Sequence, residues 1–80
     1  MNGRPNMRVR SAIAAAMHLQ RHMPGGVAYE ALTVVIDVLK SDKGAGHPQW
    51  ARASQDVMEM HQVTKNPEYR AVMAGLSALE

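Results

Sequence analysis

The chain has 80 residues, no Cys and a formal net charge of +2. This length allows one small domain, and the lack of Cys excludes disulfides and thiolate metal sites within it. Every apolar run is shorter than the about 18 residues that a membrane span requires, so we expect a soluble, cytoplasmic protein.

Positive charge is concentrated in the first part of the chain. Residues 1–29 carry four Arg and no acidic residue, whereas residues 30–80 carry five Lys or Arg and seven Asp or Glu. This asymmetry fits an acidic partner surface or a nucleic-acid backbone, and a solvated basic helix is the equally simple alternative. The arginines in question are Arg4, Arg8, Arg10 and Arg21.

The chain begins with a basic arm over residues 1–6, which we expect to be flexible. Apolar residues then recur at helical spacing and predict a helix over 7–22. Asn6 is a suitable N-cap for this helix. The sequence MPGG at 23–26 ends the helix, because neither proline nor paired glycines continue it.

The segment VAYEALTVVIDVL at 27–39 is the most apolar in the chain. At 100° per residue, Glu30, Thr33 and Asp37 fall on one line, and apolar residues cover the rest. A buried strand in a lone hairpin would also suit the run of Val and Ile. The three- and four-residue spacing of the polar residues favours a helix over 27–41, placed centrally in the fold.

Two further helices follow. The loop SDKGAGH at 41–47 leads to Pro48, which is tolerated at the first position of a helix predicted over 48–63. Asn66, followed by proline, offers an N-cap for a helix over 67–79. The sequence therefore predicts an all-α fold: a single domain that forms a compact bundle of four short helices, with the second helix central.

No catalytic or cofactor motif is present. Serine-hydrolase, Walker and dinucleotide patterns are absent, and a small helical bundle offers little concavity for a substrate. His18 and His22 have the i, i+4 spacing that can hold a metal, but Leu19 stands where the HExxH signature needs Glu. Two exposed polar side chains are the simpler interpretation. We predict no enzyme activity, no cofactor and no metal site.

Five acidic residues are candidates for a partner-binding face. Glu30 and Asp37 interrupt the apolar second helix, and Asp56 and Glu59 share the outer face of the third. Asp42 lies in the loop between these helices. If the line of Glu30 and Asp37 is exposed, it is a solvated line; if it is covered, it needs basic partners, for which the arginines of the first helix are the nearest candidates.

The alternative is a basic face that binds an acidic partner or nucleic acid. A flexible start that bears arginine is typical of an arm that contacts the phosphate backbone. The acidic outer face of the third helix has the wrong sign for phosphate, and few aromatic residues are available to stack on bases. Binding to nucleic acid would therefore be non-specific. This face comprises Arg4, Arg8, Arg10 and Arg21.

Trp50 and Met58 are candidate apolar anchors for a partner. A Trp that fills the core at the start of the third helix is the simpler interpretation of Trp50. Small residues on one flank of the last helix could let a second copy approach closely, so the protein could be a monomer or a homodimer. This flank comprises Ala71, Ala74, Gly75 and Ala78.

These features favour a non-enzymatic protein-binding regulator or inhibitor of a larger protein or ribonucleoprotein complex. In size and in its lack of any site motif, the chain resembles in kind the accessory proteins of phages and other mobile elements, anti-CRISPR inhibitors among them. That resemblance implies that the acidic residues occupy a surface that would otherwise hold nucleic acid. The alternative is a small nucleic-acid-binding regulator that uses the basic arm and the first helix.

Overall fold

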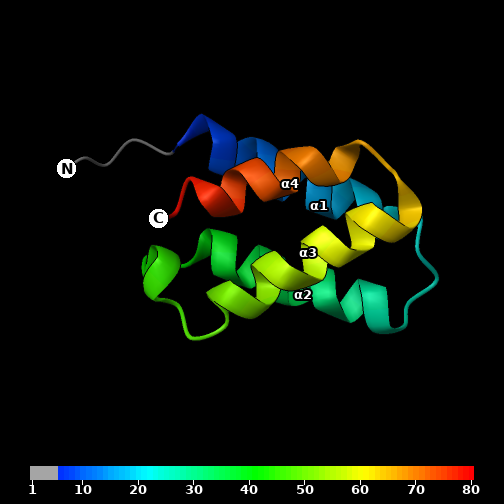
Figure 1. Cartoon of the computed structure of the whole chain (residues 1–80), viewed down its shortest axis with the longest axis horizontal. Helices are drawn as coiled ribbons and strands as arrows, with labels where there is room; N and C mark the ends of the chain where they lie inside the picture. The colour runs from blue at the N-terminus through cyan, green and yellow to red at the C-terminus, as the bar shows by residue number, and fades with distance from the viewer. Residues whose placement is uncertain (1–5) are drawn as a thin grey trace.

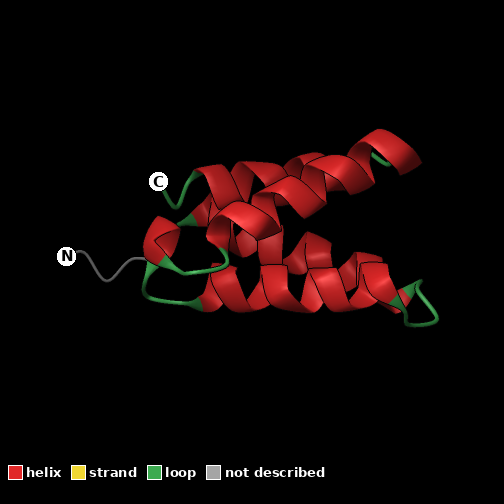
Figure 2. Ribbon diagram, turned by 60° about the horizontal axis from the view of Figure 1, so that its bottom comes forward, coloured by secondary structure: helices red, strands yellow, loops and turns green. Residues whose placement is uncertain are grey.

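The computed structural model describes residues 6–80, which form four α-helices (Figure 1). A short 3-10 helix, η1 (Gly44–Gly46), lies between the second and third of them, and residues 6–80 contain no strand (Figure 2). The predicted all-α fold is confirmed, and each helix boundary agrees with the predicted one within two residues. The helices are α1 (Met7–Arg21), α2 (Val27–Lys40), α3 (Trp50–Thr64) and α4 (Glu68–Ser77).

Consecutive helices run antiparallel, and α4 returns beside α1, so the four helices close a ring (Figure 1). Within this ring α1 packs on α2, α2 on α3, α3 on α4, and α4 on α1, and the last pair shares the most extensive contact. Short connections lead to this up-down-up-down arrangement. No described helix is long and apolar enough to cross a membrane.

The core is aliphatic apart from one buried aromatic ring, that of Tyr69. No polar or charged side chain is buried within residues 6–80. The helix α2 supplies four of the buried hydrophobic residues, more than any other helix, and it is flanked by α1 and α3. The buried hydrophobic residues are Ala12, Ala16, Leu19, Leu32, Val35, Val38, Leu39, Ala53, Val57, Tyr69, Val72 and Leu76.

Side-chain caps begin α1 and α4, as the sequence predicts. The Asn6 side chain accepts a hydrogen bond from the backbone N–H of Arg8 at 2.8 Å. The Asn66 side chain accepts one from the N–H of Glu68 at 2.9 Å. Each bond satisfies an N–H group that has no partner within its helix. The rest of the predicted arm, residues 1–5 with Arg4, lies outside the described residues.

The turn between α1 and α2 depends on glycine. Gly26 precedes α2 with φ 98° and ψ −164°, a conformation that is essentially restricted to glycine. Across this turn, the Gln20 amide of α1 donates hydrogen bonds to the carbonyl oxygen of Tyr29 and to the hydroxyl of Thr33, each at 2.9 Å. These bonds hold the last turns of α1 on the outer side of α2.

The contact between α1 and α4 requires a glycine for a different reason. A Cβ atom added at Gly75 would overlap the Cβ of Ala12 and lie 2.9 Å from the carbonyl oxygen of Arg8. The two backbones therefore approach each other closely where one residue has no side chain and the facing one has only a methyl group. Gly75 packs inside the chain and is buried, so it is not available for the predicted contact with a second copy.

Replacing Gly75 with Ala is expected to destabilise the fold by about 1–3 kcal/mol, because α1 and α4 must separate to admit the added methyl group. Chemical denaturation measures this change. Gly46→Ala is the matched control, since a Cβ at Gly46 meets no atom within 4 Å. A Gly75→Ala variant as stable as the parent chain would contradict the close approach.

Candidate functional site

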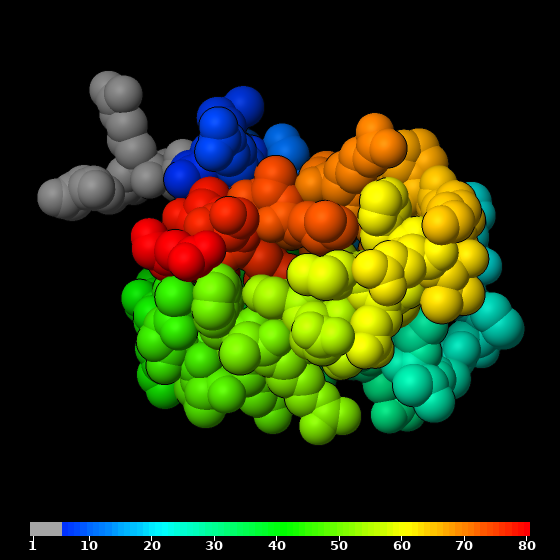
Figure 3. Space-filling model, viewed as in Figure 1, coloured from blue at the N-terminus to red at the C-terminus, as the bar shows by residue number. Residues whose placement is uncertain are grey.

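A groove of about 610 Å³ runs between α2 and α3. Figure 3 shows the face on which α3 and α4 lie, with the start of α2 beside the last turns of α3 at the lower right. The lining of the groove is mainly apolar. Its apolar residues are Val27, Ala28, Ala31 and Val34 of α2, Met60 and Val63 of α3, and Tyr69 of α4.

Two valines in this groove are almost fully exposed. Val27 has 88% of its surface exposed and Val63 has 83%. Because α2 and α3 run antiparallel, the first residue of α2 and the end of α3 lie at the same end of the bundle (Figure 1). Single exposed apolar residues are common on proteins, whereas exposed apolar residues gathered in one groove make that groove a candidate interaction site.

Three of the five predicted acidic residues line this groove: Glu30 from α2, and Asp56 and Glu59 from α3. One cationic side chain accompanies them, Arg52, whose Nε lies 3.8 Å from an Asp56 carboxylate oxygen. Glu59 accepts a hydrogen bond from the Gln55 amide at 3.0 Å. We refer to Glu30, Asp56 and Glu59 as the acidic rim of the groove.

The rim carries a net charge of −2 once the charge of Arg52 is included. Glu30 makes no ion pair within residues 6–80. The sequence placed Asp56 and Glu59 on an outer face of the third helix, and it did not indicate that an apolar groove lies beside them. An apolar lining next to uncompensated carboxylates is suited to a ligand that is both apolar and cationic.

Tyr69 closes the floor of the groove. This residue lies in the first turn of α4. Its ring is buried among the helices, with only 2% of the residue's surface exposed. Burial raises the pKa of the Tyr69 hydroxyl above its ordinary value of 10.0, and the neighbouring Glu68 carboxylate adds to this shift. The part of the lining that Tyr69 supplies is therefore uncharged at physiological pH.

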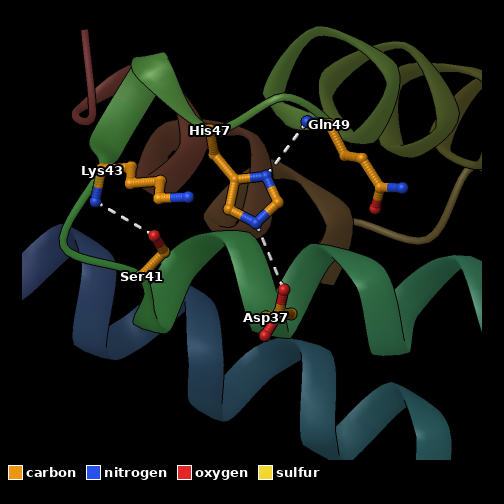
Figure 4. Close-up of polar contacts among 5 residues, drawn as sticks. All are labelled: Asp37, Ser41, Lys43, His47 and Gln49. Carbon is orange, nitrogen blue, oxygen red and sulfur yellow. Dashed lines mark hydrogen bonds and ion pairs between the residues drawn. The ribbon is translucent and has the colours of Figure 1, made fainter.

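Asp37 lies outside the groove and has a structural partner (Figure 4). Its carboxylate oxygen is 3.2 Å from Nε2 of His47, and Nδ1 of the same ring accepts a hydrogen bond from the N–H of Gln49 at 3.0 Å. Because Nδ1 accepts this bond, the Nε2–H of the ring donates a hydrogen bond to Asp37. Asp37 thus anchors the connection before α3 to α2.

Of the two alternatives for the acidic line of α2, the structure shows the exposed one, so arginines of the first helix are not needed to neutralise it. Glu30, Thr33 and Asp37 are all exposed, and the partner of Asp37 comes from the loop instead. Asp42 is exposed in a turn in which the hydroxyl of Ser41 accepts a hydrogen bond from the N–H of Lys43 at 3.0 Å. Asp37 and Asp42 are therefore separate from the acidic rim.

The described residues of the predicted basic face, Arg8, Arg10 and Arg21, are exposed and make no ion pair within residues 6–80. Arg10 and Arg21 are eleven residues apart on α1, which puts them on one line about 16 Å apart along the axis. Arg8 projects from another side of the helix. The three charges therefore do not form one compact patch.

The predicted anchors lie together in a second, smaller groove of about 460 Å³ between α3 and α4. Trp50 is half-buried there, and its Nε1 donates a hydrogen bond to the carbonyl oxygen of Leu76 at 2.9 Å. Met58 has 44% of its surface exposed. The bond from Trp50 joins the start of α3 to the end of α4, which is a structural role.

Of the predicted self-association flank, Ala74 is exposed and lines this second groove, whereas Ala71 and Ala78 are half-buried.

His18 and His22 stack edge to face with ring centroids 4.8 Å apart, and His18 Nε2 lies 3.5 Å from a Glu68 carboxylate oxygen. Within residues 6–80, no three His, Asp or Glu side chains gather where they could hold a metal.

Sequence reasoning missed Val27 and Val63, which are the most exposed apolar residues of the groove. Both stand at helix ends and off the inner stripes, and this is the signal that could have indicated them.

Comparisons of the chain with protein-family models, curated proteins and solved structures gave no match. The groove must therefore be interpreted from its own geometry and chemistry.

In a Tyr29→Phe variant, Tyr69 is the only tyrosine, and its phenol is expected to ionise with a midpoint above 10.0 in the folded protein. The folded state keeps this proton to a higher pH than the unfolded state. Stability therefore falls as pH rises from about 10 through the folded pKa, and Tyr69→Phe removes this component. Absorbance at alkaline pH measures the titration; an identical midpoint in denaturant would contradict the burial.

Proposed function

We propose that this protein is a non-enzymatic protein-binding regulator that holds a segment of a larger partner in the groove between α2 and α3. The observation that supports this most directly is the pair of exposed valines, Val27 and Val63, in one apolar groove. Full burial of a side chain of this kind contributes about 1.5–3 kcal/mol, so a partner that covers both gains affinity from them.

Inhibition is the regulatory outcome that the acidic rim supports best. Glu30, Asp56 and Glu59 put three carboxylates beside the apolar lining, with Arg52 as the nearby cation. Protein surfaces that bind nucleic acid are rich in Lys and Arg, and such surfaces attract a carboxylate cluster by the same electrostatics. We therefore propose an inhibitor of a nucleic-acid-handling complex, of the kind found among mobile-element accessory proteins such as anti-CRISPR inhibitors.

A photo-crosslinking amino acid at position 63 is expected to join the chain to one discrete partner in the cells that produce it. The same group at position 7 is the control, since Met7 is 70% exposed but belongs to the other side of the ring. The crosslinked partner is identified by mass spectrometry and then purified.

The purified partner should bind a Val27→Ser, Val63→Ser variant at least about tenfold more weakly than the parent chain, because each valine that the partner fully buries contributes about 1.5–3 kcal/mol. Met7→Ser should bind as the parent chain does. Equal affinity of all three proteins for the partner would contradict the proposed site.

Nucleic-acid binding is the second candidate function, and the exposed, unpaired side chains of Arg8, Arg10 and Arg21 favour it. Three separated cations release few counterions, so they support only weak binding with a shallow salt dependence. On the other side of the molecule, the negative charge of the acidic rim opposes the binding of nucleic acid.

Titration with mixed-sequence duplex DNA tests this alternative. We expect no measurable binding at about 0.15 M salt, because phosphate contacts by three arginines are screened there. Tight binding that weakens steeply with salt, and that an Arg10→Gln, Arg21→Gln variant loses, would put the nucleic-acid function first.

A further inference from the structure

We propose that the occupant of the groove between α2 and α3 is a cationic amphipathic helix, with apolar side chains on the groove floor and Lys or Arg beside the acidic rim. This inference rests on the proposed function and names the chemical class of the partner segment. Three properties of the groove support it: its charge, its lack of free backbone groups and its length.

The charge of the groove selects a cation. Glu30 stands on the α2 side, and Asp56 and Glu59 stand on the α3 side, so a ligand that lies between the helices meets carboxylates on both flanks. Arg52 is engaged by Asp56 at 3.8 Å, and Glu30 has no ion-pair partner within residues 6–80. A cationic ligand compensates this charge, whereas an anionic peptide or a phosphate backbone is repelled.

The walls of the groove select a helix. Both walls are α-helices, whose backbone groups are paired internally, so the groove offers side chains and no free backbone edge. An extended peptide would leave its own N–H and C=O groups unpaired against Ala31, Val34 and Met60. A helix satisfies its own backbone and presents only side chains, which is the helix-in-groove mode of recognition.

The length of the groove suits such a helix. Its lining on α3 runs from Gln49, just before the helix, to Thr64, a rise of about 22 Å at 1.5 Å per residue. A helix of about 14 residues covers that distance and presents apolar anchors at i, i+4, i+7 and i+11. The exposed Val27 and Val63 at one end of the groove would contact the terminal anchor.

A second copy of this chain is the competing occupant. The outer line of α1 carries Arg10 and Arg21, with Met17 between them at 45% exposure. This line has the right charge, but Met17 is its only large exposed apolar side chain. One anchor leaves most of the apolar lining uncovered, so the observations favour a separate partner.

Three synthetic peptides test the proposal against the full chain by fluorescence anisotropy. The first is a cationic amphipathic helix with Leu at the four anchor positions and Lys elsewhere. The second replaces every Lys with Glu, and the third keeps the cationic composition in shuffled order. We expect the first peptide to bind at least about tenfold more tightly than either of the others.

Two double variants locate the binding. Each should bind the first peptide about tenfold or more weakly than the parent chain does. The variants are Val27→Ser with Val63→Ser, and Glu30→Gln with Glu59→Gln. The matched controls, Met58→Ser and Asp42→Asn, change an exposed apolar and an exposed acidic residue outside this groove and should bind as the parent chain does.

Equal binding of the cationic and anionic peptides would overturn the charge assignment, and equal binding of the shuffled peptide would overturn the helical one. Sedimentation that shows a dimer lost in the Val27→Ser, Val63→Ser variant, without peptide binding, would assign the groove to a second copy. If no peptide binds while the crosslinked partner still requires Val27 and Val63, this inference is wrong and the proposed function stands. If that partner also binds the Val27→Ser, Val63→Ser variant as tightly as the parent chain, this inference and the proposed function are both wrong.

Discussion

The close approach of α1 and α4 determines the shape of this bundle. Gly75 faces Ala12 where no further atom can be admitted, so these two helices pack backbone to backbone. On the opposite side of the ring, α2 and α3 share a smaller contact, as do the other two neighbouring pairs of helices. The groove between α2 and α3 lies across the ring from the α1–α4 contact, and the exposed Val27 and Val63 lie in it.

Three polar contacts hold the helices that form the groove in place. Gln20 of α1 bonds Thr33 on the outer side of α2. His47 ties the connection before α3 to Asp37 of α2, and the indole of Trp50 bonds the end of α4. Each contact lies outside the groove itself. The groove is therefore held by neighbouring structure, and the exposed Val27, Val63 and Glu30 take no part in these contacts, an arrangement that favours preorganised binding.

The helices were predictable because their signals are local. Asn6, Asn66 and the glycines before α2 act within a few residues, so the pattern of the chain was sufficient. The groove was not predictable, because it depends on how α3 is rotated against α2. The sequence selected Glu30, Asp56 and Glu59 by charge alone, and it grouped them with Asp37, whose partner His47 is ten residues away in a loop. It also indicated a small-residue flank on α4, but not that α1 of the same chain would occupy Gly75.

The proposed site requires that the α2–α3 groove is open in the free protein, with Val27 and Val63 exposed. The most direct measurement is the relaxation of methyl NMR signals by a soluble nitroxide, which broadens methyl groups that solvent can reach. We expect the methyl signals of Val27 and Val63 to broaden as strongly as that of Met7, while those of Val35, Val57 and Val72 stay sharp. Protection of Val27 and Val63 to the level of the core valines would contradict the open groove.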